Sequence, residues 1–451
     1  MNSVTNRRLA EGYIEELAAL NAGLASVVEQ VVSSVAGDLS EEEFSAWLNA
    51  SRQLSRDLSD APAVSINYLR SSKEILGLSG PATLTRCADI ALELAHRSPE
   101  IATSFLQAAP SFLSHGLSSN LKDWADMGSR MCTDSWKSVS LAKTFFALSH
   151  SILESTSLAS FRVLAQVVTE LSRRSIELAI SCLKQAAENF SSLEDDVHLP
   201  YLNLAGVIVR SNWNAAWLYF EQAPGKLNRF QRSETSAFLS LIAPIAAEGS
   251  PYSRFEEISL AVSQFDENEH GELAKMAQRL VDISPVAAAE FLISAPFIRE
   301  RLSPSFMWRW LEMGLEMKGD DAGLEQVPSE ELEAYFRLQS VTADKTLALL
   351  SGRVEFEKSA NLFRFYGQAL TGDKVLVQPA SHLVNRGLGW TSGARATTEG
   401  TVIFVPPHID LFGDIESNLQ IYKVCIAHQS GRLTFGSHDF QYDVNGRYLE
   451  S

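Results

Sequence analysis

The chain of 451 residues has only four cysteines, and no two of them form a Cys-x-x-Cys pair. Structural zinc sites and thiol redox sites usually place cysteines at that short spacing, so neither kind of site is indicated. We interpret the four cysteines as free thiols in a reducing compartment and expect a cytoplasmic protein. No cofactor is expected.

Long apolar segments are also missing. A membrane-spanning helix needs about 18 or more consecutive apolar residues, and the sequence contains no such run. Near the N-terminus, Arg7 and Arg8 are followed by Glu11, Glu15 and Glu16 where a signal peptide would have its apolar core. We therefore expect neither membrane insertion nor a cleaved signal.

Basic residues are few relative to acidic ones. The sequence has 38 Lys and Arg against 55 Asp and Glu, which gives a formal net charge of -17. Nucleic acids and anionic membranes both need clustered cations, so this balance disfavours either partner.

Catalytic and nucleotide motifs are absent as well. The glycine-rich segment 385–400 contains Arg386 and Arg395, and two interpretations of it stay open. It forms either a plain hairpin loop or a phosphate cradle, although it lacks the Gly-Lys-Ser/Thr ending of a P-loop. Arg386 and Arg395 are retained as candidates for contacts with a partner.

What the sequence does contain is a repeat. The segments Ser98-Pro-Glu-Ile-Ala-Thr-Ser-Phe-Leu-Gln-Ala-Ala-Pro110 and Ser284-Pro-Val-Ala-Ala-Ala-Glu-Phe-Leu-Ile-Ser-Ala-Pro296 share seven residues in identical places. Weaker copies place a pair of large apolar residues at the same offset, and the pairs are Phe105-Leu106, Phe145-Phe146, Cys182-Leu183, Tyr219-Phe220 and Phe291-Leu292. A blurred copy is expected near Ser250-Pro251.

A period of about 40 residues is typical of units with two helices, which bury their apolar stripes by stacking. The repeat predicts a HEAT-like α-solenoid over 79–320, and the alternative is an irregular helical bundle. Pro110, Pro224 and Pro296 are expected to kink or end the repeating helix. Residues 1–78 are predicted to form a helical cap, with a capped helix start at Ser40.

The composition changes after about residue 318, and 325–451 is predicted to be a small α+β module. The expected elements are helices over 328–351 and 360–370, strands over 374–378 and 401–405, a loop over 385–400, and a helix from about 416. Before this module, Trp308 and Trp310 stand beside Phe306. Such a cluster is either core or the seam between the repeats and the module, and the seam makes both tryptophans candidate partner contacts.

The last predicted helix resembles a zinc-peptidase helix that has lost its chemistry. A working helix carries His-Glu-x-x-His, in which two imidazoles bind zinc and the glutamate activates water. Here His428 is present, but Gln429 replaces the glutamate and Arg432 replaces the second histidine. We therefore expect a degenerate zincin-like module without catalytic or metal-binding residues, in which these three residues contact a partner. The alternative is an active zinc metallopeptidase completed by His438 or Asp439.

Several segments resemble the rubisco-activation and nitric-oxide-reductase-activation proteins of the CbbO/NorD type. They are Tyr335-Phe-Arg-Leu338, Leu362 to Gly372, Thr397-Thr-Glu-Gly400, Val402 to Pro407 and, most specifically, Tyr422-Lys-Val-x-x-Ala-His-Gln-x-Gly-x-Leu-x-Phe-Gly436. The helical repeats also resemble that family. The resemblance implies a non-catalytic adaptor that directs a MoxR-type AAA+ ATPase ring onto a client enzyme. A generic scaffold without an ATPase partner is the other alternative.

The sequence departs from the family in two ways. The family usually has a histidine where this chain has Arg432, and it continues into a von Willebrand factor A domain with an Asp-x-Ser-x-Ser motif, which is absent here. We therefore expect a chain that corresponds to the N-terminal part of the family, as a fragment, the product of a split gene or a lineage without that domain. The metal-dependent adhesion function of that domain is not carried over.

Overall fold

A computed structural model describes residues 2–20, 22–133, 135–230, 232–247, 250–316, 329–372, 375–381, 396–409, 411–412, 414–435, 441–442 and 448–449. The protein is mainly helical, as the sequence predicts. It divides into two compact units, Met1–Ser263 and Gln264–Ser451. The predicted boundaries near residues 78 and 320 stay predictions. Among the described residues, no helix is both long enough and apolar enough to span a membrane.

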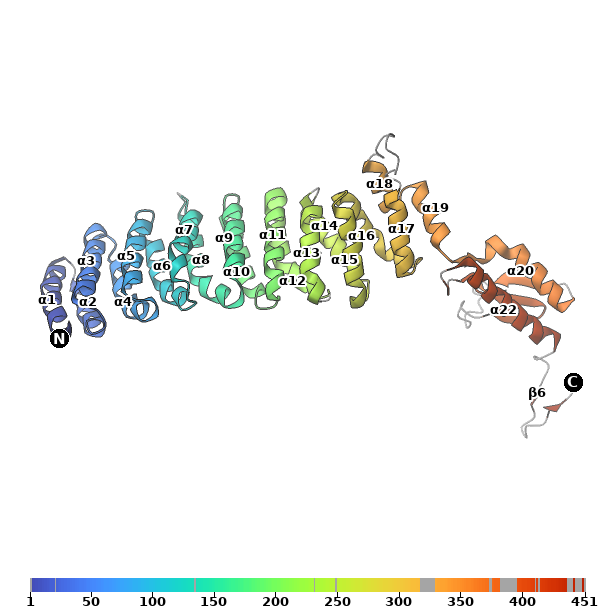
Figure 1. Ribbon diagram of the computed structural model, residues 1–451, viewed down its shortest axis with the longest axis horizontal. Helices are drawn as coiled ribbons and strands as arrows, with labels where there is room; N and C mark the ends of the chain where they lie inside the picture. The colour runs from blue at the N-terminus through green and yellow to red at the C-terminus, as the bar shows by residue number, and fades with distance from the viewer. Residues whose placement is uncertain are drawn as a thin grey trace. The chain divides into compact units, whose positions relative to one another are not determined.

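The first unit is built from helices that follow one another in chain order (Figure 1). They are α1 (Asn2–Leu20), α2 (Ala22–Val35), α3 (Glu41–Asp57), α4 (Pro62–Ser79), α5 (Pro81–Ala95), α6 (Pro99–Leu113), α7 (Leu121–Met131), α8 (Trp136–Ser155), α9 (Leu158–Ser172), α10 (Ile176–Asn189), α11 (Asp195–Asn212), α12 (Ala216–Leu227), α13 (Arg232–Ala247) and α14 (Pro251–Val262). Each helix packs against the next-but-one helix, so the even-numbered helices form one row and the odd-numbered helices a second row.

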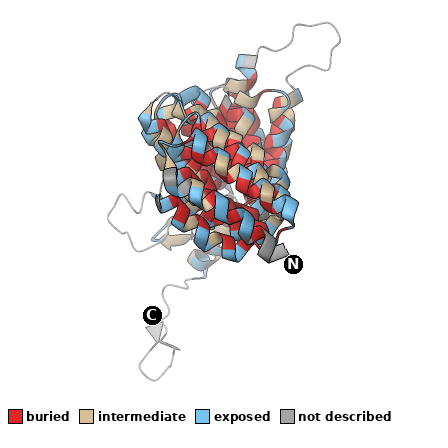
Figure 2. Ribbon diagram, turned by 90° about the vertical axis from the view of Figure 1, so that its left-hand side faces the viewer, coloured by how far each residue is buried: buried red, intermediate tan, exposed pale blue. Residues whose placement is uncertain are grey.

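The sequence repeat falls on the even-numbered helices. The five apolar pairs of the repeat lie on α6, α8, α10, α12 and, in the second unit, α16, and every member of these pairs is 0% exposed. The blurred copy at Ser250-Pro251 begins α14. Figure 2 shows buried and exposed residues alternating along the helices, which is the pattern of a helix packed on one side.

The helix start predicted at Ser40 is confirmed, whereas three prolines of the repeat lie inside their helices. Ser40 and Glu43 form a reciprocal capping box at the start of α3. Pro110, Pro224 and Pro296 do not end their helices, because each helix continues for three more residues, to Leu113, Leu227 and Arg299. Each helix therefore ends within one turn of its proline, which removes one backbone hydrogen bond and crowds the carbonyl four residues earlier.

After the short 3-10 helix Glu267–Glu269, the described part of the second unit continues with α-helices. They are α15 (His270–Val281), α16 (Pro285–Arg299), α17 (Pro304–Glu316), α18 (Ser329–Phe336) and α19 (Val341–Leu350). The single helix predicted over 328–351 is wrong, because Leu338 adopts a φ of 60° between α18 and α19. The Gln339 amide donates to the Ala334 carbonyl at 2.8 Å and the Leu338 amide to the Tyr335 carbonyl at 3.0 Å, which is the pattern of a Schellman motif.

The described remainder of the second unit contains short strands and the helices α20 and α22. They are β1 (Val354–Glu355), α20 (Phe356–Thr371), β2 (Leu376–Pro379), β3 (Thr397–Glu399), β4 (Val402–Val405), β5 (His408–Ile409), α22 (Ile415–Thr434), β6 (Gln441–Tyr442) and β7 (Tyr448–Leu449). Strand β4 is central, parallel to β2 and antiparallel to β3. The predicted strands and both predicted helices are present, but Thr397–Glu399, expected as loop, forms the third strand.

The core of this α+β part lies where α20 and α22 pack on each other and on the strands. Phe363 of α20, Ile403 of β4 and Tyr422 of α22 are each 0% exposed and belong to one cluster. The Phe363 and Tyr422 rings stack with centroids 4.4 Å apart. Gly372, in the left-handed region at φ 69°, ends α20, since glycine carries no Cβ penalty there.

Candidate functional site

Helix α22 carries the three residues of the peptidase-like pattern, and it places two of them on the surface and one in the interior. His428 and Arg432, one turn apart, are both exposed, whereas Gln429 is 4% exposed. Val424, one turn before His428, is 62% exposed and extends the same outer stripe. His428 and Arg432 therefore share a surface that is open to a partner, and Gln429 does not belong to it.

Gln429 holds the neighbouring strand instead. Its side-chain amide donates to the Ala396 carbonyl at 3.0 Å, immediately before β3. Its Oε1 atom is buried without a partner among the described residues. Within the same described part of the chain, no group of three His, Cys, Asp or Glu side chains is placed to hold a metal ion.

The start of α22 is fixed by a buried asparagine. Asn418 is 0% exposed, and its Oδ1 accepts from the amides of Leu411 and Phe412, each at 2.9 Å. Its Nδ2 donates to the carbonyls of Gly352 and Phe412, each at 2.6 Å. One side chain thus joins α22 to the segment before β1 and to the segment after β5. It orients the helix that presents His428.

Tyr422, one turn further along α22, completes this anchoring. Its hydroxyl donates to the Pro406 carbonyl at 2.8 Å, at the end of β4. Burial raises the pKa of Tyr422, so the side chain stays a neutral hydrogen-bond donor. Asn418 and Tyr422 therefore have a structural role that these hydrogen bonds define.

The two tryptophans predicted as partner contacts are placed differently from each other. Trp310 of α17 is 0% exposed and stacks on Tyr335 of α18, with centroids 4.6 Å apart. Trp308 is half-buried, and its indole nitrogen donates to Glu272 of α15 at 3.0 Å. Trp310 is therefore a core residue within the second unit, while part of Trp308 is accessible.

The remaining predicted site residues cannot be placed. Arg386 and Arg395 lie outside the described residues, and so do His438 and Asp439 of the metallopeptidase alternative.

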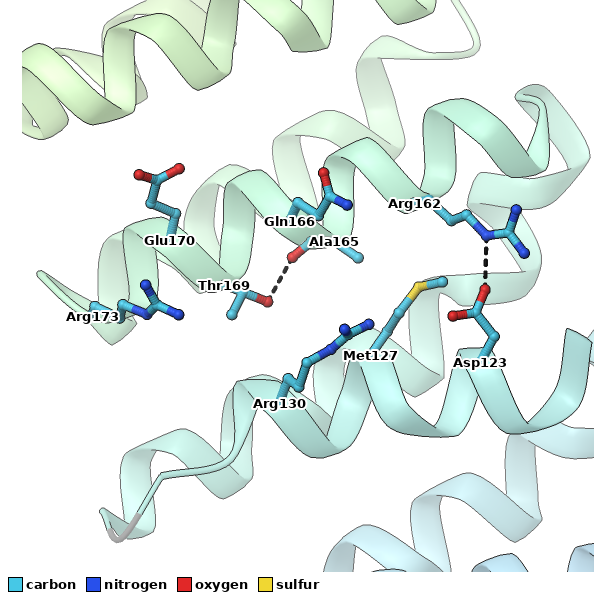
Figure 3. Close-up of a pocket in the computed structure, with 9 residues that line it drawn as sticks. All are labelled: Asp123, Met127, Arg130, Arg162, Ala165, Gln166, Thr169, Glu170 and Arg173. Carbon is cyan, nitrogen blue, oxygen red and sulfur yellow. Dashed lines mark hydrogen bonds and ion pairs between the residues drawn. The ribbon is translucent and has the colours of Figure 1, made fainter.

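A groove of about 500 Å³ lies between α7 and α9 in the odd-numbered row of the first unit (Figure 3). Its lining residues are Asp123, Met127, Arg130, Arg162, Ala165, Gln166, Thr169, Glu170 and Arg173. Met127 and Ala165 are 4% and 2% exposed, so the floor is apolar. The walls are polar and carry both signs of charge.

The charges in the groove are not all neutralised. Asp123 pairs with Arg162 at 2.7 Å, and Glu170 pairs with Arg210 of α11 at 3.8 Å. Arg130 and Arg173 are exposed and have no ion-pair or hydrogen-bond partner among the described residues. In Figure 3 their side chains lie on either side of Thr169. The groove therefore offers two guanidinium groups that are free to bind an anionic group.

Sequence reasoning missed this groove. The repeat directs attention to the even-numbered helices, whereas Arg130 and Arg173 lie at the C-terminal ends of two odd-numbered helices. The available signal was an arginine at both of these helix ends in a chain of net charge -17. Comparisons with family models, with curated proteins and with solved structures find no match for this chain.

Proposed function

We propose that this protein is a non-catalytic adaptor that binds a MoxR-type AAA+ ATPase ring and directs its remodelling activity onto a client enzyme. The client is of the kind implied by the sequence resemblance, an enzyme related to rubisco or to nitric oxide reductase. In this proposal the stacked helical pairs form a HEAT-like solenoid, and the α20–α22 part is a degenerate zincin-like module. The protein acts in the cytoplasm.

The observation that carries the proposal is the orientation of α22. Gln429, at the position of a catalytic glutamate, is committed to the Ala396 carbonyl at 3.0 Å. An inward amide that holds a strand is not free to activate water, and glutamine has no titratable proton. The outward stripe with His428 and Arg432 remains available for contact with another protein.

Two rows of packed helices support the same proposal. Each row of the first unit leaves one side of every helix exposed, as the burial pattern indicates. Proteins built from repeated helical pairs use such extended surfaces for docking. The chain contributes the surface, and the ATP hydrolysis comes from the partner.

The test is co-purification of the chain with a MoxR-type ATPase, with and without ATP. We expect ATP-dependent capture that the double substitution H428A/R432A reduces by about tenfold, the loss of roughly one good contact. The matched control is E357A, an exposed position on α20 that lies outside this stripe. Capture that is equal in all three proteins contradicts the assignment of α22.

Metal analysis distinguishes the enzyme alternative. Stoichiometric zinc in the purified protein, lost in the His428→Ala variant, would establish a metal site and end the adaptor proposal.

A further inference from the structure

We propose that the groove between α7 and α9 binds an acidic peptide segment of a protein partner, with carboxylates on Arg130 and Arg173. This inference goes beyond the proposed function, because it requires neither the ATPase ring nor α22. The carrying observation is a pair of exposed guanidinium groups that line one groove and have no partner among the described residues.

The chemistry of the two arginines favours carboxylates. A guanidinium group presents a planar fork of donors that matches a carboxylate in a bidentate geometry, and such charge-assisted bonds are stronger than neutral ones. The apolar floor of Met127 and Ala165 accepts the aliphatic part of a Glu or Asp side chain. Both features fit an acidic side chain better than a free inorganic ion.

An exposed tryptophan stands at the same edge of the helical rows. Trp136, the first residue of α8, is 78% exposed and follows the short turn that leaves α7. The next residue, Lys137, forms an ion pair with Glu177 at the start of α10, which follows the turn that leaves α9. The starts of α8 and α10 therefore lie together, and they follow in the chain the ends of α7 and α9 that carry Arg130 and Arg173. Tryptophan and arginine are the residues most enriched at the energetic centres of interfaces.

The position of the arginines alone has a simpler structural explanation. A cation near the C-terminus of a helix is stabilised by the helix dipole, by about 0.3 to 1 kcal/mol. That explanation predicts a loss of helix stability when the arginines are removed, and no effect on binding. It also leaves the exposure of Trp136 unexplained.

A nucleic acid is a poorer occupant of the groove. Asp123 and Glu170 line the same walls as the two arginines and would repel a continuous row of phosphates. Two free cations are also fewer than the roughly six to ten phosphate contacts that a nucleic-acid-binding protein makes. A short segment with spaced carboxylates avoids this repulsion.

The test is fluorescence anisotropy with a dye-labelled dodecapeptide in which Glu and Asp residues are spaced by Ser residues around one Leu. The full chain should bind this probe with an affinity that falls as salt is added. The R130Q/R173Q variant should weaken binding about tenfold or more, and W136A should weaken it severalfold. The control is R70Q, which removes a cation from an exposed position of α4 and should leave the affinity unchanged.

Two further measurements make the result decisive. Thermal unfolding of R130Q/R173Q should stay within a few degrees of the parent protein, which separates binding from folding. The matched peptide of Gln and Asn should bind at least tenfold more weakly than the acidic one.

Equal binding of the neutral peptide, unchanged binding by R130Q/R173Q, or no binding of the acidic probe would each overturn the proposal. Tighter binding of single-stranded DNA than of the acidic peptide would also overturn it. The assay contains no ATPase, so a failure here leaves the adaptor proposal standing.

Discussion

The Nε2 atom of His115, in the turn after α6, lies 2.9 Å from the Nδ1 atom of His150 in α8, so the two imidazoles share one hydrogen bond. Such a bond needs a neutral acceptor ring, and it is lost when both rings are protonated. The second nitrogen of His150, Nε2, lies 3.4 Å from Glu154. Burial, and then the neighbouring His150, lower the pKa of His115 below its usual 6.5.

The first prediction is that this histidine pair makes the folded protein less stable in acid. Because the pKa of His115 is lower in the folded state than in the unfolded state, the unfolded chain binds more protons in the window below pH 6.5. The free energy of unfolding should therefore fall as the pH drops through that window. His150→Ala should return the pKa of His115 part of the way toward 6.5, since burial remains. Titration of the His115 ring by NMR measures this, and an unchanged pKa in the variant contradicts it.

The second prediction concerns a close approach of two helices. Gly128 of α7 has no room for a Cβ atom, because that atom would overlap the buried Phe146 ring of α8. Gly128→Ala should lower the free energy of unfolding by about 1 to 3 kcal/mol through overpacking. Gly225→Ala in α12, where nothing lies within 4 Å, should instead be neutral or stabilising. Urea denaturation compares the two, and equal effects would contradict the predicted overpacking.

The third prediction concerns the anchor of α22. Asn418→Ala removes four hydrogen bonds and leaves buried backbone groups unpaired, so we expect a loss of about 2 to 3 kcal/mol. Gln420→Ala, at an exposed position of the same helix, should change stability by less than about 0.5 kcal/mol. Urea denaturation followed by far-UV circular dichroism measures the free energy of unfolding of both variants. A small effect of Asn418→Ala would show that water replaces its partners.

The fourth prediction concerns a nearly buried carboxylate. Glu290 of α16 is 6% exposed, and its Oε1 lies 2.9 Å from Nη2 of Arg337, just after α18. Arg337→Met should destabilise the second unit by about 1 to 3 kcal/mol, because the carboxylate stays buried while Arg337 itself is partly exposed and screened. The double variant E290Q/R337M should recover part of this loss. A double-mutant cycle that returns no coupling energy would rule out the proposed pairing effect.

Much of the helical part was predictable because the repeat records a physical requirement. Phe145 and Phe146 are both 0% exposed, and so are the paired residues of the other copies, because an apolar residue recurs wherever the packed face of the helix does. Strand β3 was missed because Thr397–Glu399 is too short for a period of two to be visible. The break at Leu338 was missed because leucine rarely adopts a positive φ.

The groove depended on information that periodicity does not contain. Arg130 and Arg173 are separated by a whole helical pair in the chain, and only the packing of α7 against α9 brings them to one groove. Likewise, the sequence identifies Gln429 as a substitution of a catalytic residue but not the Ala396 carbonyl that it binds. Both the groove and the Gln429 hydrogen bond depend on contacts between segments that are distant in the sequence.

In the first unit each helix rests on its near neighbours in the chain, and this locality has a mechanical consequence. A tension applied along the chain would not have to break one shared core, because each helical pair detaches from the next with its own interface. A single-molecule pulling experiment on residues 1–263 should therefore record a series of small extension steps. The first unit would unfold in steps under tension, and it would refold one helical pair at a time when the tension is removed.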